Sequence, residues 1–283
     1  MRNAEWNVRL SIGVPSLWDR TVPLNSAFRI PHSALGGVGL SGFWLGIDTA
    51  TEIASVAAGR PPAAQSGAHV QGARRHAAEI IRLVDFALSR LGIRPADLEG
   101  IVVGDGPGSF TGLRIGWAAA KGLAQEAGLE LRAIPSLMAA AAGAALQLGA
   151  EPVAACFDAL RGQVYGALYV IHPDRVETLV APAVLTVAEL ARDAPVRPRL
   201  VVGDGAVRYA EQVARWIGTA PVPLESVPPA ATLLLALLER EGTGRTIADP
   251  ATAEPAYGRP AEAQARWEAR HGRPLPDSPR PAG

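Results

Sequence analysis

The run Val-Val-Gly-Asp-Gly occurs twice in this chain of 283 residues, at residues 102–106 and 201–205. Each copy follows a strand-like run and opens into a helix-like stretch. Upstream of each copy, another strand-like run ends in an aspartate, Asp48 in the first half and Asp158 in the second, and a hairpin signal follows. The same order of elements therefore appears twice. We interpret this order as a duplicated α/β unit that forms two lobes.

The hydrophobic pattern predicts the elements of both halves. In the first half we expect strands at 43–48, 53–58, 101–103 and 129–134, and helices at 73–91, 111–127 and 136–148. Ser136 is the expected N-cap residue of the last of these helices. In the second half we expect strands at 152–158 and 163–171, a further strand entering the second glycine motif, and helices at 207–217 and 230–241.

These elements predict a division of the chain into four parts. Residues 1–42 mix Pro, Gly, Ser and isolated Trp without a sustained period, so we expect them to be poorly ordered. Residues 43–148 are expected to form the first lobe and 149–259 the second lobe. The Pro-rich residues 260–283 are expected to form a loose tail.

Composition excludes several classes of protein. Lys and Arg together number 27, as do Asp and Glu, and a formal net charge of zero argues against holding nucleic acid by bulk electrostatics. The single cysteine, Cys156, excludes a disulfide within the chain and fits a reducing compartment. No apolar stretch is long enough to span a membrane, and the N-terminus lacks the layout of a secretion signal. We therefore expect a cytoplasmic protein that makes no membrane contact.

The first glycine motif predicts a turn with an open backbone. Glycines at 104, 106, 108 and 112 permit close backbone approach, and a helix N-terminus follows directly. The spacing matches neither a Walker A loop nor the dinucleotide fingerprint. Two interpretations stay open: contact with an anion or nucleotide, or a tight strand-to-helix turn inside a packed core.

The helix that follows the turn carries small residues at a strict spacing of four: Gly112, Gly116, Ala120 and Ala124. Such a ridge lets another backbone approach closely. The ridge can serve a partner's helix or the chain's own packing, and the spacing alone does not separate the two.

The preceding helix, 73–91, has more apolar surface than one core contact needs. Its apolar stripe includes Ile80, Val84 and Leu88, but Ile81 and Phe86 lie off that stripe. A helix with apolar residues on more than one face is a candidate interface element.

Four stretches carry a resemblance to a known family. They are Leu45–Glu52, Gly106–Gly116, Asp158–Tyr165 and Glu254–Arg259, in this order along the chain. Together they resemble the bacterial TsaB (YeaZ) family over about residues 43–260. The resemblance implies the duplicated actin/hexokinase/Hsp70-like (ASKHA) fold. It also implies a part in adding threonylcarbamoyl to N6 of adenosine 37 in tRNAs that read ANN codons (t6A biosynthesis), together with TsaD, TsaE and TsaC-type proteins.

The resemblance further implies a non-catalytic role. The catalytic relative, TsaD, binds metal through a His-x-x-x-His pair, and this sequence contains no such pair. We therefore expect no catalytic residues, no metal site, and access to tRNA only through the complex, with TsaD and TsaE as partners. In the family the two helices discussed above pair with TsaD, or with a second copy in a homodimer when TsaD is absent. This implies contacts at His76, Ile80, Val84, Gly112, Arg114, Gly116 and Ala120.

In the wider fold class, the first hairpin and the glycine turn hold nucleotide phosphates. This implies nucleotide contacts at Asp48, Thr49, Gly106, Gly108 and Ser109. The sequence departs from the pattern at Ala50, where the hairpin normally has glycine, and at Leu160, where relatives usually have arginine. We therefore expect no nucleotide of its own, or ATP or ADP held jointly with TsaD and TsaE. The alternative function is a stand-alone ATPase or kinase of the same fold.

Overall fold

The computed structural model describes residues 40–223, 226–227, 229–259 and 270–271. By its contacts the chain divides at Gly37, and all described residues belong to the unit Val38–Gly283. The predicted poorly ordered segment up to residue 39, and the tail beyond residue 259 except residues 270–271, lie outside the described residues.

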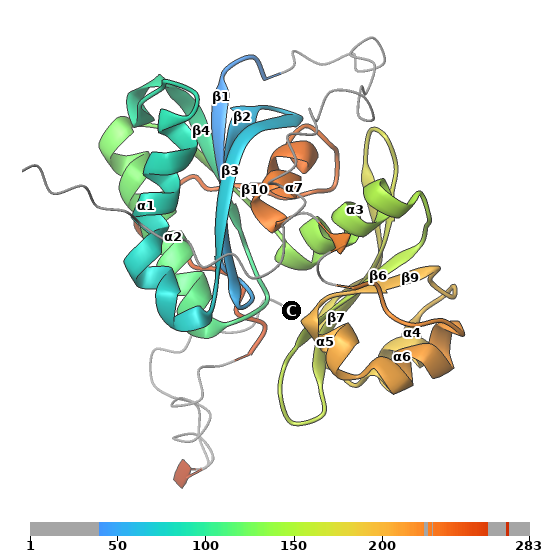
Figure 1. Cartoon of the computed structure of the whole chain (residues 1–283). Coiled ribbons are helices and arrows are strands. Elements are labelled where there is room, and N and C mark those ends of the chain that lie inside the picture. Colours follow the sequence, from blue (N-terminus) through green and yellow to red (C-terminus); the bar gives the residue numbers. More distant parts are fainter. Residues whose placement is uncertain (1–39, 224–225, 228, 260–269, 272–283) are drawn as a thin grey trace, which may run out of the picture. The chain divides into compact units, whose positions relative to one another are not determined.

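The first sheet has six strands in the order β10–β5–β4–β1–β2–β3 (Figure 1). They are β1 (Phe43–Asp48), β2 (Ile53–Arg60), β3 (Ala63–Gln71), β4 (Leu98–Gly104), β5 (Glu130–Ile134) and β10 (Arg245–Thr246). Strands β1, β2 and β3 form an antiparallel meander, β4 runs parallel to β1, and β5 runs parallel to β4. The strands β1 and β4 are apolar over most of their length because helices cover the sheet on both faces, whereas β5 also carries Glu130 and Arg132.

The second sheet repeats this connectivity in four strands, in the order β8–β7–β6–β9. They are β6 (Val153–Asp158), β7 (Val164–Ile171), β8 (Val176–Leu185) and β9 (Leu200–Val202). Here too the first three strands form a meander and the fourth runs parallel to the first. The duplicated α/β unit predicted from the repeated glycine motif is confirmed, and so is the ASKHA-like fold that the resemblance implies.

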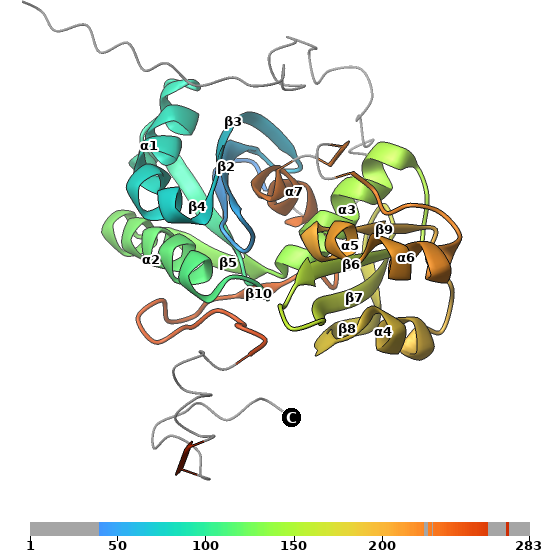
Figure 2. The ribbon, with the colours of Figure 1, turned by 60° about the horizontal axis from the view of Figure 1, so that its bottom comes forward.

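Helices cover the outer face of each sheet. On the first sheet, α1 (His76–Ser89) and α2 (Phe110–Ala127) lie side by side (Figures 1 and 2), and the short turns η2 (Ala73–Arg75) and η3 (Pro95–Asp97) lie at the ends of the α1 segment. On the second sheet lie α4 (Val187–Asp193), α5 (Asp204–Arg208) and α6 (Ala210–Ile217). The predicted helix 207–217 is therefore two helices, since the backbone of Tyr209 leaves the helical region. In the part of the chain that is described, no helix combines the length and apolarity that crossing a membrane requires.

The two remaining helices exchange places between the sheets. α3 (Ser136–Leu148) follows β5 of the first sheet but packs on β6, β7 and β9 of the second, whereas α7 (Ala230–Leu237) follows the second sheet but packs on β1 to β4 of the first. The structure thus differs from the predicted division into 43–148 and 149–259, and β10 also returns to the first sheet. Both helices are apolar on most of their surface, and each buries one side on a sheet and another on its neighbour.

Candidate functional site

The glycine turn after β4, residues 104–109, packs against the hairpin turn between β1 and β2. The amide of Ser109 donates to the carbonyl of Ala50 over 2.7 Å, and Oγ1 of Thr49 donates to the carbonyl of Gly112 over 2.8 Å. A Cβ atom at Gly108 would collide with the carbonyl of Ala50. Glycine is needed here because the hairpin backbone itself occupies the inner side of the turn.

Asp48, at the end of β1, is buried beneath this turn. Its Oδ2 accepts a hydrogen bond of 2.6 Å from Oγ of Ser136, and its Oδ1 accepts one of 3.2 Å from the amide of Ala50. Burial disfavours the charged carboxylate and raises the pKa of Asp48 from 3.8 to about 6, against the opposing effect of these hydrogen bonds. The prediction that Ser136 caps α3 is wrong, because Pro135 is the N-cap residue and the Ser136 hydroxyl reaches Asp48 instead.

The predicted nucleotide contacts are used inside the chain. The side chains of Asp48 and Thr49 belong to residues that are only 2% exposed. The amide of Gly106 donates to Oγ of Ser136, and Oγ of Ser109 caps α2 by accepting from the amide of Gly112. Gly106 and Gly108 are buried. Of the two interpretations left open by the sequence, the structure has the tight strand-to-helix turn, and these residues do not fit a phosphate group.

The small-residue ridge of α2 faces the chain itself. Gly112, Gly116, Ala120 and Ala124 are all buried, and a Cβ atom at Gly116 would collide with Oγ1 of Thr49. The prediction that Gly112, Gly116 and Ala120 contact a partner directly is therefore wrong, because the chain itself covers them. Gly112 and Gly116 have to be small because Thr49 of the hairpin turn lies against them, and Ala120 and Ala124 pack into the core beneath α2.

A second stripe of α2 faces outward instead. Arg114, Ala118 and Gly122 follow one another at a spacing of four and are exposed, and a Cβ atom at Gly122 would meet nothing within 4 Å. Arg114 is thus the one predicted contact on this helix that lies at the surface. The sequence shows small residues in both stripes, and their spacing does not say which stripe faces inward.

On α1 the predicted contacts are also buried. His76, Ile80 and Val84 pack beneath the helix, and Nε2 of His76 lies 3.1 Å from the carbonyl of Glu52. These three residues cannot touch a partner directly, since they form the contact between α1 and the sheet. The outer side of α1 instead exposes Ile81 (58%) and Phe86 (49%).

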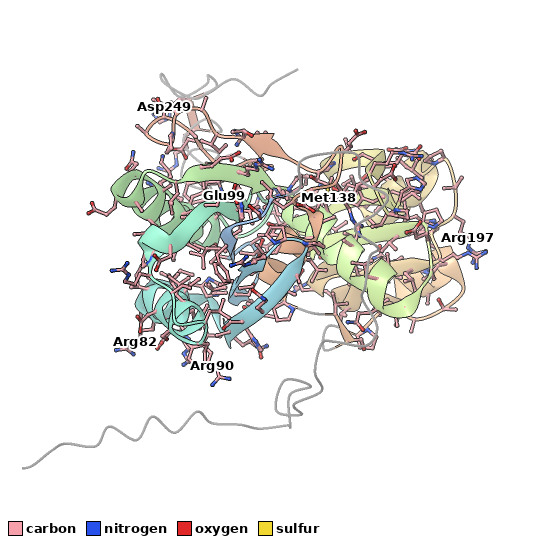
Figure 3. All side chains as sticks on the ribbon, turned by 90° about the horizontal axis from the view of Figure 1, so that it is seen from above. Arg82, Arg90, Glu99, Met138, Arg197 and Asp249 are labelled. Carbon is pink, nitrogen blue, oxygen red and sulfur yellow. The ribbon has the colours of Figure 1, made fainter. Side chains whose placement is uncertain are left out.

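We call the exposed side of these two helices the outer helix face. It consists of Ala78, Ile81, Arg82, Phe86 and Arg90 from the α1 segment and of Arg114, Ala118 and Gly122 from α2. Figure 3 shows Arg82 and Arg90 pointing outward from α1. Two large apolar side chains, small residues and exposed arginines together form a surface that another protein can cover.

The C-terminal segment, residues 249–259, runs along the same side of the first lobe. Nζ of Lys121 donates to the carbonyls of Ala251 (3.1 Å) and Ala253 (2.9 Å). Arg245, just before the segment, donates two hydrogen bonds of 3.0 and 3.1 Å to the carboxylate of Asp105 in the glycine turn. Burial raises the pKa of Asp105 although Arg245 opposes the shift. We call residues 249–259 the C-terminal strap.

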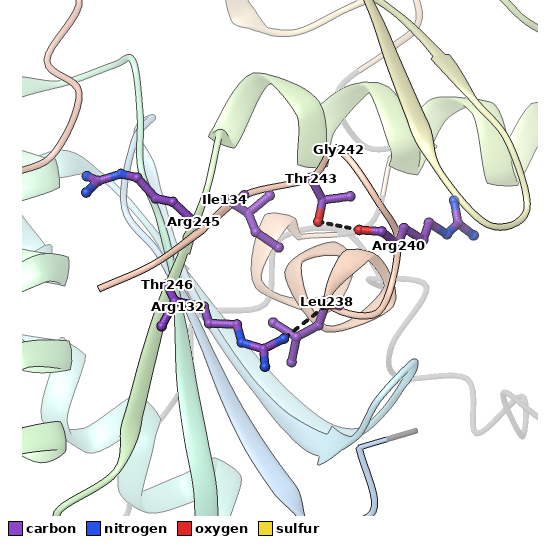
Figure 4. A pocket seen from close by; sticks show the side chains of 9 residues that line it. Arg132, Ile134, Leu238, Arg240, Gly242, Thr243, Arg245 and Thr246 are labelled. Atoms are coloured by element: carbon purple, nitrogen blue, oxygen red, sulfur yellow. Dashed lines mark hydrogen bonds between the residues drawn. The ribbon is translucent and has the colours of Figure 1, made fainter. Parts of the chain in front are cut away.

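A small pocket of about 170 Å³ lies between β5, β10 and the end of α7 (Figure 4). Arg132 lines it but donates to Glu130 over 2.6 Å and to the carbonyl of Leu238 over 3.4 Å. The side chain of Arg245 points away from the pocket toward Asp105. The guanidinium groups of Arg132 and Arg245 are thus already hydrogen-bonded. Arg240 also lines the pocket, and its buried Nε and Nη1 atoms have no hydrogen-bond partner within the described part of the chain. Nowhere in the described ranges do three His, Cys, Asp or Glu side chains gather closely enough to hold a metal ion.

Comparison of the chain with known proteins shows the family to which it belongs. A family model described as TsaD, tRNA N6-adenosine threonylcarbamoyltransferase, matches residues 70–210. The tRNA threonylcarbamoyladenosine biosynthesis protein TsaB of Escherichia coli K12 is 37% identical over 148 residues, which cover 50% of this chain and 63% of that protein. TsaB of Bacillus subtilis 168 is 32% identical over 207 residues, 69% of this chain and 84% of that protein. The chain belongs to the TsaB family.

A solved structure agrees with this assignment. A Pseudomonas aeruginosa protein described as similar to peptidase YeaZ superposes with a TM-score of 0.63 at 28% identity, covering 77% of this chain and 100% of that chain. The match to the Escherichia coli relative spans just under two thirds of that protein's length. Over most of its length the chain therefore has the architecture of a TsaB-family protein.

Proposed function

We propose that the chain is a non-catalytic subunit of the t6A biosynthesis machinery and that it binds a TsaD-type transferase through the outer helix face. The observation that carries the proposal is the exposure of Ile81 and Phe86 on α1 beside the small-residue stripe of α2. Large exposed apolar side chains on a helix that packs beside a second helix with small surface residues are typical of protein interfaces. When TsaD is absent, the same face pairs with a second copy of the chain.

The buried first hairpin supports the non-catalytic role over a stand-alone ATPase or kinase. A phosphate at the glycine turn would have to displace the Ala50 carbonyl and the Thr49 hydroxyl from their partners. Asp48 is hydrogen-bonded to Ser136 and only 2% exposed, which leaves almost no surface from which to orient a metal-bound water. In this proposal any ATP or ADP is held with TsaD and TsaE, tRNA is reached through the complex, and the protein acts in the cytoplasm.

Reconstitution tests the proposal. TsaD, TsaE and the TsaC-type enzyme of the same organism are mixed with tRNA, threonine, bicarbonate and ATP, with or without the purified chain. We expect t6A only in the complete mixture, no product with the chain alone, and no ATP turnover by the chain alone. Full product formation without the chain would refute the proposal, and steady ATP hydrolysis by the chain alone would favour the ATPase alternative.

A site-directed variant then locates the surface. Phe86→Ser removes an exposed apolar group from the outer helix face and leaves the core residues of α1 in place. We expect weaker binding to TsaD with an unchanged melting temperature. Val196→Ser, at an exposed apolar residue of the second lobe, is the matched control.

A further inference from the structure

The two hairpin turns of the duplicated fold differ in what covers them. In the first lobe the glycine turn of residues 104–109 covers the hairpin, and Ala50 is buried. In the second lobe, α5 begins at Asp204, one residue after β9, and Gly203 and Gly205 pack against residues 156–158 of the second hairpin's first strand. No loop of the described chain equivalent to 104–109 lies over the second hairpin. Leu160, on that hairpin, is 54% exposed.

The second hairpin also holds an unusual backbone. Leu160, Arg161 and Gly162 have φ values of 62°, 53° and 82°, so three successive residues adopt the left-handed conformation. This conformation is natural for glycine and unfavourable for leucine. A strained, exposed apolar residue persists only when the surrounding structure holds it, and such residues are concentrated at functional surfaces.

Arg259, the last residue of the C-terminal strap, holds this turn. Its Nη1 donates to the carbonyl of Ala159 and its Nη2 donates to Oε1 of Gln163, both over 2.6 Å. The amide of Leu160 donates to Oδ1 of Asp158 over 3.0 Å. These bonds fix both ends of the turn, so Leu160 is presented in one orientation.

A series of contacts connects this turn to the outer helix face. The guanidinium of Arg114 lies over the ring of Phe110, at 5.5 Å from its centre, and the rings of Phe110 and Tyr257 are 4.5 Å apart. Gly258 then lies between Pro107 and Tyr165, and Arg259 reaches the turn. A protein that covers the first turn of α2 therefore borders the strap, and the strap borders Leu160.

From these observations we infer that the second hairpin is an additional contact point for the partner protein that covers the outer helix face, with Leu160 as its apolar anchor and Arg259 as the residue that positions it. This inference rests on the proposed function. Val207 of α5 is exposed nearby, and the exposed Arg208 pairs with Asp158 over 3.4 Å. The matching surface of the partner presents an apolar side chain, with a carboxylate at its edge to meet Arg208.

Two substitutions at Leu160 test the inference through affinity for TsaD and melting temperature. Leu160→Ser and Leu160→Gly both remove the anchor, and we expect each to weaken binding about three- to tenfold. Glycine also relieves the left-handed conformation, so Leu160→Gly should keep or raise the melting temperature while binding weakens. A purely structural role for Leu160 would move both quantities in the same direction.

The positioning role of Arg259 is tested in the background of these variants. We expect Arg259→Ala to weaken binding in the native chain but to add little when Leu160 is already glycine, and Arg259→Lys to recover part of the affinity. Val196→Ser again serves as the control.

The outcomes separate this inference from the proposed function. If Phe86→Ser weakens binding and both Leu160 variants bind like the native chain, the inference is wrong and the proposed function stands. If none of the three changes binding, the outer helix face itself is wrongly assigned. If Leu160 variants keep their affinity for TsaD but the assembled complex binds tRNA more weakly, the turn contacts RNA and the inference is overturned.

Discussion

Oγ of Ser136 lies 2.6 Å from Oδ2 of Asp48, and this hydrogen bond joins the end of β1 to the first turn of α3. Since α3 packs on the second sheet, the bond also connects the two lobes through a buried carboxyl group. A Cβ atom at Gly104 would collide with the same carboxylate, so three separate segments meet at Asp48.

The burial of Asp48 predicts a specific pH dependence of stability. The pKa of Asp48 is about 6 in the folded chain, whereas its ordinary value in an unfolded chain is 3.8. Between these pH values the folded state therefore holds a proton that the unfolded state has lost. Stability should fall as pH rises from about 4 to 6, by about 3 kcal/mol in total. Asp48→Asn keeps an oxygen that accepts from Ser136 and removes this dependence. Urea unfolding of both proteins from pH 4 to 8 measures the difference, and parallel curves would contradict the prediction.

The two small-residue stripes of α2 predict opposite effects for the same kind of substitution. Gly116→Leu places a side chain against Thr49, and we expect it to destabilise the chain by roughly 1–3 kcal/mol or more. Gly122→Leu enters open space, where leucine should raise stability by up to about 1 kcal/mol over glycine in a helix. On the outer helix face it should hinder TsaD binding. Thermal unfolding measures the stability of both variants, and a binding titration measures their affinity for TsaD. A Gly116→Leu protein as stable as the native chain would contradict the packing of Gly116 against Thr49.

The Arg245–Asp105 pair predicts how firmly the C-terminal strap is held. Arg245→Met leaves a buried carboxylate without its guanidinium partner, which should cost about 1–3 kcal/mol. Adding Asp105→Asn should restore part of that stability. Hydrogen exchange at the amide of Ala256, which donates to the carbonyl of Asp105 over 2.9 Å, should speed up in the single variant. Equal protection in both proteins would mean that the pair does not hold the strap.

Removal of the N-terminal segment is predicted to leave the fold intact. The amide of Leu40 donates to Glu239 over 2.7 Å and the amide of Gly42 donates to Glu99 over 2.8 Å, so a shortened chain should begin at Val38 in order to keep both hydrogen bonds. A chain beginning at Val38 should keep the melting temperature and the TsaD affinity of the full chain. A clear fall in either quantity would assign a role to residues 1–37.

The sequence allowed the fold to be predicted because the repeated glycine motif and the apolar runs are local signals. The strand at 43–48 and the helix at 136–148 lie where the pattern predicted them. The exchange of α3 and α7 was not predictable, because a helix that is apolar all round does not indicate which sheet it covers. For the same reason the spacing of small residues did not decide whether Gly116 faces a partner or the chain itself. The resemblance implied a partner contact, whereas in the structure Gly116 packs against Thr49.

The candidate site was harder to predict, because the sequence does not show which residues of the two helices are buried by the chain itself. Arg114 is exposed as its predicted role requires, but His76, Ile80 and Val84 are covered by the chain itself. The sequence marked Ile81 and Phe86 as apolar residues off the main stripe, and both are exposed in the structure. The strained turn at Leu160 has no sequence signal of its own, because its backbone is set by Arg259 from a distant segment.

The exchange of α3 and α7 between the sheets has a consequence for how the molecule can be divided. A fragment ending at residue 148 would carry α3 without the strands that α3 covers. The complementary fragment would carry α7 without the strands that α7 covers. Neither piece can bury its apolar helix alone, so each should aggregate when produced singly. Produced together, the two pieces should associate into the native arrangement, because each fragment supplies the sheet that the other fragment's helix covers.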